Sequence, residues 1–174
     1  MSGPEHSNTL VVINFISLIL KTKPMKQIAD NLTSALDKFL NDSPKPKDWA
    51  YKPSPDKWSA KEILGHLTDS AHINLERFVR CTYEEKFRLV YQQNQWVAAQ
   101  QYQQADTDDV ITLWNLVNRQ IVRTLSNYPE DRWQATCDTG HFEPAFHTVE
   151  FLAADYIRHM QHHLDQIIAL SHAN

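Results

Sequence analysis

Residues 58–81, WSAKEILGHLTDSAHINLERFVRC, carry the clearest helix signal in this 174-residue chain. Ser59 and Glu62 match the capping box S-x-x-E, in which the two side chains bind backbone N–H groups at the start of a helix. Residues at helical spacing then form one inner stripe, made up of Ile63, Leu64, Leu67, Ala71, Asn74, Leu75 and Phe78. The segment therefore predicts an amphipathic helix from Ser59 to about Cys81.

Three further segments show the same periodicity. They run from Met25 to about Asn41, from about Asp106 to Asn127, and from Thr148, a predicted N-cap, to about Ser171. The stripe of the 106–127 helix consists of Val110, Leu113, Trp114, Val117, Ile121 and Leu125. Long connections separate the second helix from the third and the third from the fourth, and a long crossover allows successive helices to run parallel. The sequence predicts an all-α four-helix bundle with at least one crossover.

Composition and charge narrow the class of protein. Hydrophobic residues make up 42% and charged residues 22%, as is usual for a globular domain, and 3 glycines are few for a β-rich fold. A net charge of −4 gives no basic surface for nucleic acid or for an anionic membrane. Two cysteines, Cys81 and Cys137, cannot form a disulfide framework. We therefore expect a reduced, cytoplasmic protein.

Residues 1–24 precede the regular helical pattern of the chain. The apolar run Leu10–Leu20 is too short to span a bilayer, and its basic neighbours follow it, unlike those of a secretory signal. Met25 opens the regular pattern. We expect residues 1–24 to be an extra segment, packed or poorly ordered, and residues 25–174 to be the domain.

Three histidines form the candidate site. His159 and His163 stand four residues apart, so both rings project from one face of the last helix. His66 occupies a comparable position on the second helix, since all three lie roughly 60–100° from the centre of their apolar faces. Three imidazoles with open coordination positions are typical of a catalytic metal site. Spacing alone leaves half-buried structural histidines as an equal alternative.

The other histidines and Asp69 are predicted to lie outside the candidate site or beside it. His162 points opposite the apolar face and is interpreted as solvated surface, and Asp69 and His72 are expected to project away from the core. His141 and His147 lie in or beside the connector before the last helix, where no pattern fixes their direction. They remain supplementary candidates.

Residues 52–78, KPSPDKWSAKEILGHLTDSAHINLERF, and 152–167, LAADYIRHMQHHLDQI, resemble the DinB/YfiT-like superfamily of bacterial four-helix-bundle metalloproteins. The segment QWVAAQQY, residues 95–102, is similar to the crossover of YfiT-like members. The resemblance implies an up-down-down-up bundle with metal ligands at His66, His159 and His163. It also implies that the chain is a metal-dependent hydrolase, or a transferase or isomerase that uses mycothiol or bacillithiol. Members of the superfamily are often homodimers, so the resemblance implies a homodimer here.

The predicted function is a metal-dependent enzyme acting on a small molecule, namely a hydrolase in which the three histidines hold one divalent ion, zinc or nickel. Such an ion lowers the pKa of bound water to about 7. It equally deprotonates a coordinated thiol, so a low-molecular-weight-thiol S-transferase is an alternative. A non-catalytic metal-binding bundle would keep the same ligands without a substrate pocket.

Weaker candidates surround the histidines. Arg77 could hold a substrate carboxylate or phosphate, although an interhelical ion pair would equally explain it. Trp96 and Tyr102 could wall a pocket or simply cap the core. Further polar candidates are Ser70 on the His66 side of its helix, and Asp165 and Glu150 as acceptors for ligand N–H groups. Neither cysteine is given a role.

Overall fold

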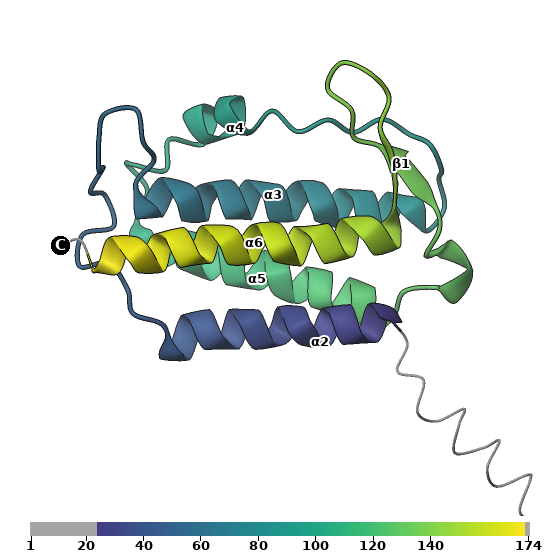
Figure 1. The fold of residues 1–174 in the computed structure, drawn as a ribbon, viewed down its shortest axis with the longest axis horizontal. Coiled ribbons are helices and arrows are strands. Elements are labelled where there is room, and N and C mark those ends of the chain that lie inside the picture. The colour runs from purple at the N-terminus through teal and green to yellow at the C-terminus, as the bar shows by residue number, and fades with distance from the viewer. Residues whose placement is uncertain (1–23, 173–174) are drawn as a thin grey trace, which may run out of the picture.

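The computed structural model describes residues 24–172, and four long helices dominate it (Figure 1). They are α2 (Pro24–Asp37), α3 (Ala60–Cys81), α5 (Thr107–Ser126) and α6 (Val149–Ser171). The π-helical turn η1 (Lys38–Asp42) extends α2, the short helix α4 (Gln93–Gln100) lies in the crossover, and η2 (Glu130–Arg132) follows α5. Apart from Pro24, the predicted N-terminal segment 1–24 lies outside the described residues.

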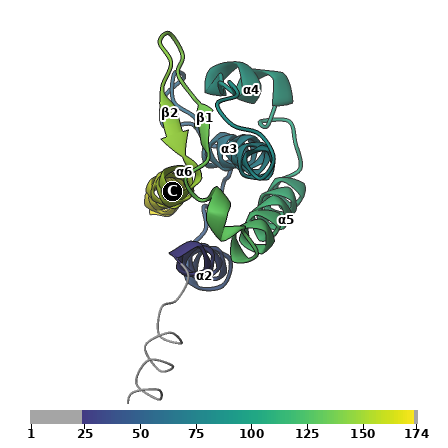
Figure 2. The same ribbon diagram turned by 90° about the vertical axis from the view of Figure 1, so that its right-hand side faces the viewer.

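The helix order is up-down-down-up. α2 and α6 run in one direction while α3 and α5 run in the other, and each long helix packs against two neighbours (Figures 1 and 2). α5 lies between α2 and α3, and α6 packs against α3 on the opposite side of the bundle (Figure 2). The predicted all-α four-helix bundle with a crossover is confirmed.

A two-stranded hairpin, which the sequence analysis did not predict, precedes α6. Strand β1 (Thr136–Asp138) pairs antiparallel with β2 (Phe146–Thr148), with Cys137 opposite His147. Each strand has only three residues, too few to show a period-2 pattern in the sequence. The hairpin leads directly into α6 through Thr148.

The helix starts follow the predicted caps. The Ser59 hydroxyl accepts the Glu62 backbone N–H at 3.2 Å, and the Glu62 carboxylate accepts the Ser59 N–H at 2.8 Å. Asp106 accepts two backbone N–H groups at the start of α5, and Thr148 accepts the Phe151 N–H at the start of α6. These side chains satisfy donors that a helix start leaves without intrahelical partners.

The core lies between the four helices and contains the predicted stripes of α3 and α6. Trp114 on α5 is fully buried at its centre, with the ring of Phe39 edge-on at 5.4 Å. Leu113 is 46% exposed, so its predicted inward position is wrong. The same stripe predicts an inward Trp114 at the adjacent position, and this prediction is confirmed. None of the described helices is long and apolar enough to cross a membrane.

The crossover covers one side of α3. The Tyr102 ring, just after α4, packs so closely on Gly65 that a Cβ at this glycine would lie 2.2 Å from it. Its hydroxyl donates to the Asp69 carboxylate at 2.6 Å. Asp69 lies on the side of α3 that faces the crossover, away from the four-helix core as predicted, but it is fully buried because the crossover covers it. The outer face of α3 is a second interior, because the crossover packs there.

We predict that Gly65→Ala destabilises the fold. Alanine favours a helix over glycine by about 1 kcal/mol, but overpacking against the Tyr102 ring costs about 1–3 kcal/mol. Thermal unfolding should show a lower Tm for Gly65→Ala. In a Tyr102→Ala background the same substitution should raise the Tm, because the ring is gone. An equal effect in both backgrounds would contradict the close packing.

A second prediction concerns pH. Burial raises the pKa of Asp69 to about 6, whereas an unfolded aspartate titrates near ~4. Between about pH 4 and pH 6 the unfolded state has released this proton while the folded state still holds it. The contribution of Asp69 to the free energy of unfolding is therefore fully present below about pH 4 and is lost as the pH rises through about 6. Asp69→Asn keeps an oxygen that can accept from the Tyr102 hydroxyl. Because an amide does not titrate in this range, the variant should not lose stability as the pH rises.

Melting curves from about pH 4 to pH 7 should therefore show an Asp69→Asn advantage that grows with pH, on the order of 1 kcal/mol at the upper end. The matched control is Asp165→Asn, at an exposed position on α6. Parallel pH profiles for wild type and Asp69→Asn would contradict the pKa assignment.

Candidate metal centre

Three histidines from two helices converge where α3 packs against α6. His66 comes from α3, and His159 and His163 come from successive turns of α6. One ring nitrogen of each lies within 4.8 Å of the others, and the Nε2 atoms of His66 and His159 are 3.2 Å apart. The ring centroids are 4.6–5.1 Å apart pairwise. The helical phase predicted from the sequence therefore brings these residues together.

Neighbouring side chains fix the orientation of two rings. The Tyr91 hydroxyl lies 2.9 Å from Nδ1 of His66, and the Gln166 side-chain oxygen accepts from Nδ1 of His163 at 2.8 Å. Both contacts occupy Nδ1 and leave Nε2 as the nitrogen available to a metal. The Trp58 ring packs beside His66, with centroids 5.1 Å apart. Hydrogen bonds of this kind hold metal-binding imidazoles in one orientation.

The three imidazoles are held in their neutral form. Burial, with the nearby His159 and His163, lowers the pKa of His66 to about 3. Burial and the neighbouring His163 lower the pKa of His159 to about 4, and burial also lowers the pKa of His163. Neutral imidazole is the form that coordinates a metal, so proton competition is weak at neutral pH.

The donor set fits a divalent transition metal. Two ligands about 2.0–2.1 Å from a tetrahedral zinc ion lie roughly 3.3 Å apart, close to the separation of the His66 and His159 nitrogens. Nitrogen donors suit zinc, nickel, copper and iron rather than magnesium or calcium. Among the described residues, these three histidines are the group of His, Cys, Asp or Glu side chains arranged to share an ion.

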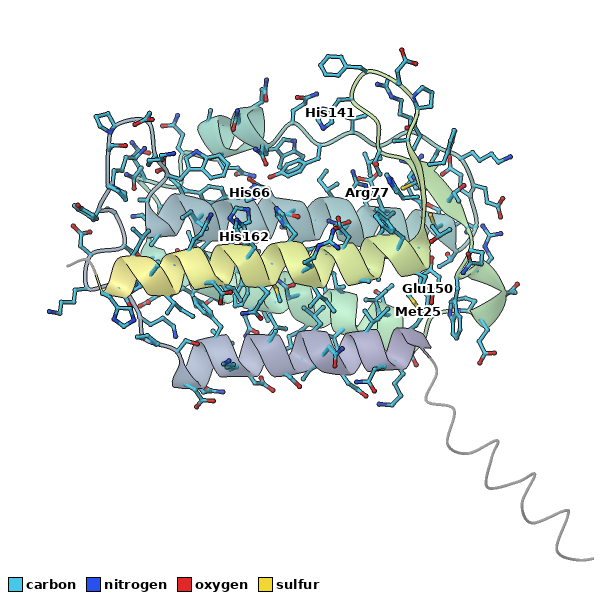
Figure 3. All side chains as sticks on the ribbon, viewed as in Figure 1. Met25, His66, Arg77, His141, Glu150 and His162 are labelled. Atoms are coloured by element: carbon cyan, nitrogen blue, oxygen red, sulfur yellow. The ribbon has the colours of Figure 1, made fainter. Side chains whose placement is uncertain are left out.

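A polar cavity of about 410 Å³ extends from the histidines along α3 and α6. α3 contributes His66, Ser70, Asn74 and Arg77, while α6 contributes Leu152, Asp155, Tyr156 and His159. Tyr91, the residues after it and His141 complete the lining, and His141 lies above α3 (Figure 3). The volume is in the range of small-molecule sites.

A second depression of about 630 Å³ adjoins the other side of the histidines. It is lined by His163, Gln166 and Leu170 of α6, together with Trp58 and Pro53 from the α2–α3 connection. His66 and His159 line the polar cavity, whereas His163 lines this second depression. The triad therefore stands between two hollows of different chemistry.

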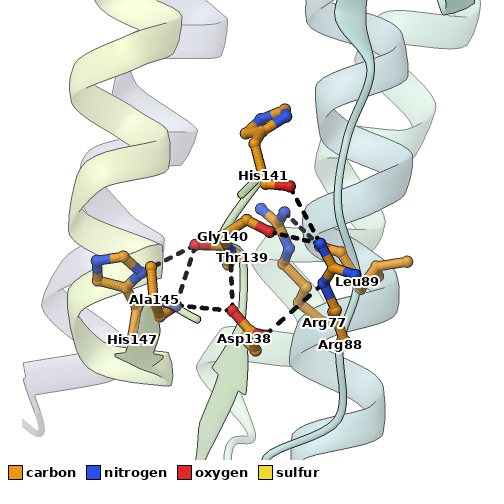
Figure 4. Close-up of polar contacts among 9 residues, drawn as sticks. All are labelled: Arg77, Arg88, Leu89, Asp138, Thr139, Gly140, His141, Ala145 and His147. Carbon is orange, nitrogen blue, oxygen red and sulfur yellow. Dashed lines mark hydrogen bonds and ion pairs between the residues drawn. The ribbon is translucent and has the colours of Figure 1, made fainter. Parts of the chain in front are cut away.

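The hairpin loop that carries His141 is tied down by an acidic side chain. Asp138 accepts the backbone N–H groups of Gly140 at 2.9 Å and Ala145 at 2.8 Å (Figure 4). Arg88 pairs with Asp138 and donates to the backbone oxygens of Gly140 and His141. This network explains how an exposed histidine is held beside the cavity.

The other predicted candidates lie in several places. Trp96 packs edge-on to Tyr91 without lining the polar cavity, and Tyr102 lies over Gly65. Asp165 is exposed and accepts from Gln161. Glu150 bonds to Gln134. His147 bonds to Thr139 and stacks on Phe151. His162 is exposed and bonds to Gln166. The N–H partners predicted for Asp165 and Glu150 are instead Tyr91 and Gln166.

Several cavity residues were not found from the sequence. The periodicity puts Asn74 in the inner stripe of α3, and an amide within an apolar stripe is the available signal of a polar pocket. Asp155 lies on the same side of α6 as His159, one turn earlier. Tyr91 belongs to the crossover, 25 residues from His66, where no periodicity predicts its position.

Residues 28–167 match the family model of the DinB superfamily. The chain belongs to the DinB superfamily. No curated protein matches its sequence significantly. The family assignment agrees with the resemblance in the GHL segment and the H-x-x-x-H pair, and with the observed helix order.

Two solved structures share the fold of this DinB-superfamily chain. The first is YfiT from Bacillus subtilis, described as a probable metal-dependent hydrolase with an unusual four-helix bundle topology. It is 16% identical, with a TM-score of 0.72 over 99% of this chain and 93% of YfiT. The second is a mycothiol-dependent maleylpyruvate isomerase, 12% identical, with a TM-score of 0.63 over 82% of this chain and 59% of the isomerase. At these identities the likeness establishes the fold.

Proposed function

We propose that this protein is a metal-dependent enzyme acting on a small molecule, with His66, His159 and His163 holding one divalent ion, zinc or nickel. The observation that carries the proposal is the convergence of three imidazole nitrogens beside a polar cavity that His66 and His159 line. A structural zinc site is closed by four protein ligands, whereas three leave a position for a reactant. The expected reaction is hydrolysis.

The residues around the triad have defined parts in this proposal. A divalent ion, when bound, supplies Lewis acidity that activates water or a thiol at neutral pH. Tyr91 and Gln166 hold the imidazoles in position through Nδ1. Trp58 covers His66, which is only 1% exposed, and so limits access of bulk water to this side. Substrate is positioned by the polar side chains of the cavity.

Thiol transfer is the second candidate function. The fold shared with a mycothiol-dependent isomerase favours it, as does the second depression, which offers a thiol a separate approach to His163. A non-catalytic metal-binding bundle is less favoured. A cavity of small-molecule size beside the triad would have no purpose in a purely structural site.

The adjacent histidines of α6 provide a matched test of the ligand set. His163→Ala should lower the bound divalent metal of purified protein at least tenfold, because it removes one of three inward donors. His162→Ala, at the exposed neighbouring position, should leave the metal content unchanged. Elemental analysis after dialysis against zinc or nickel measures both. Equal loss in the two variants would contradict the assignment.

Product analysis separates the two chemistries. Hydrolysis of an ester or amide panel should require divalent metal and water, and should consume no thiol. Thiol transfer should instead require metal plus an added low-molecular-weight thiol, and mass spectrometry of an electrophilic substrate should show a thioether. His66→Ala is the inactive control for both assays. Retained activity in metal-free protein or in His66→Ala would refute the proposed centre.

A further inference from the structure

A row of polar side chains follows one face of α3 away from the triad. His66, Ser70, Asn74 and Arg77 are separated by four, four and three residues and all line the polar cavity. Such spacing keeps side chains on one helix face over three turns. Figure 3 shows His66 and Arg77 at separate points along α3. The row ends in the cationic side chain that lines the cavity.

Arg77 is buried, and it has no carboxylate partner among residues 24–172. It is 8% exposed, one Nη donates to the Leu89 backbone oxygen at 2.8 Å, and the other lies 3.4 Å from the Asn74 side-chain oxygen. In the described part of the chain, its Nε has no hydrogen-bond partner. Desolvation by burial lowers the pKa of Arg77. A buried cation with unused donors is costly unless an anion joins it.

Other arginines of the described chain show the contrast. Five of them form ion pairs with carboxylates, namely Arg80, Arg88, Arg119, Arg132 and Arg158. Glu76, the carboxylate that acts on Arg77 through its charge, pairs with Arg80. Asp155 lines the same cavity and bonds to Arg158. Glu76 and Asp155 therefore each pair with another arginine, and the other groups whose charges act on Arg77 are the buried thiols of Cys137 and Cys81.

We propose that Arg77 binds a carboxylate of the substrate at the end of the cavity away from the histidine triad. A planar guanidinium with free N–H groups matches a carboxylate, and the Asn74 amide and the Ser70 hydroxyl lie beside the path between them. One cation suits a monoanion. A phosphate dianion would meet the Asp155 carboxylate with too little positive charge.

The length of the helix sets the length of the ligand. Eleven residues separate His66 and Arg77, which is roughly 16 Å along a helix axis. Both side chains lean toward the helix N-terminus, and the longer arginine reaches back farther than His66, so its head group lies somewhat closer to the triad than the backbone spacing. The substrate is thus an elongated monocarboxylate whose reacting group lies on the order of 10 Å from its carboxylate.

The inference rests on the proposed function for the reacting end only, so the two ends are tested separately. The first measurement uses metal-free protein and compares hexanoate with hexanamide by NMR titration. Hexanoate should bind at least tenfold more tightly, because a charge-assisted hydrogen bond is lost with the amide. Equal binding of the two probes would overturn the carboxylate site, whatever the fate of the metal proposal.

The second measurement uses zinc-loaded protein and a probe with two ends. Octanedioic acid monohydroxamate carries a metal-binding group and a carboxylate, and its methyl ester lacks the charge. Calorimetry should show the acid binding about tenfold more tightly than the ester to wild-type protein. Weak binding of both probes, with hexanoate still preferred over hexanamide, would refute the metal centre and leave Arg77 as the carboxylate site.

Two variants assign the effect to Arg77. Arg77→Met should abolish the preference for the acid while leaving ester affinity and zinc content unchanged. Arg123→Met, at an exposed arginine outside the cavity lining, should keep the preference. A preference that persists in Arg77→Met would overturn the proposal. The acid–ester comparison in wild-type protein decides the question even if Arg77→Met does not fold.

Discussion

The antiparallel packing of α3 against α6 is the constraint on which the site depends. It places a ligand from one helix opposite two from the other, and it sets the walls of the polar cavity. The partner of α3 on its other side, α5, runs parallel to it and requires the crossover (Figure 1). The helix order therefore contributes to the site in two ways. It sets α3 antiparallel to α6, and its crossover supplies Tyr91.

The sequence predicted those parts of the structure that local periodicity controls. The capping box of α3, the stripe of α6 and the relative phase of His66, His159 and His163 follow from residues within one or two helical turns. The burial of Asp69 could not be predicted in this way. The surroundings of this side chain are set by Tyr102, which is 33 residues away and packs there because Gly65 has no side chain.

The same reasoning explains the other differences. Periodicity predicts one buried and one exposed face, as for a helix that is covered on one side. α3 is instead covered by α5, by α6 and by the crossover that contains α4. Residues 59–71 are consequently all buried, including several polar side chains. The second-layer partners Tyr91 and Gln166 depend on where loops and side chains settle after the helices pack. Leu113 is exposed because Trp114 fills the inward position of α5.

The two hollows beside the triad have a consequence for the order of events at the site. His66 and His159 face the polar cavity that ends at Arg77, while His163 faces the depression beside Trp58 and Leu170. Gln93 and Asn94 line both hollows, so the two adjoin beside the triad. In the proposed enzyme, molecules seated in the two hollows would meet at these two side chains, and the order in which they bind would depend on how far the first to arrive displaces them.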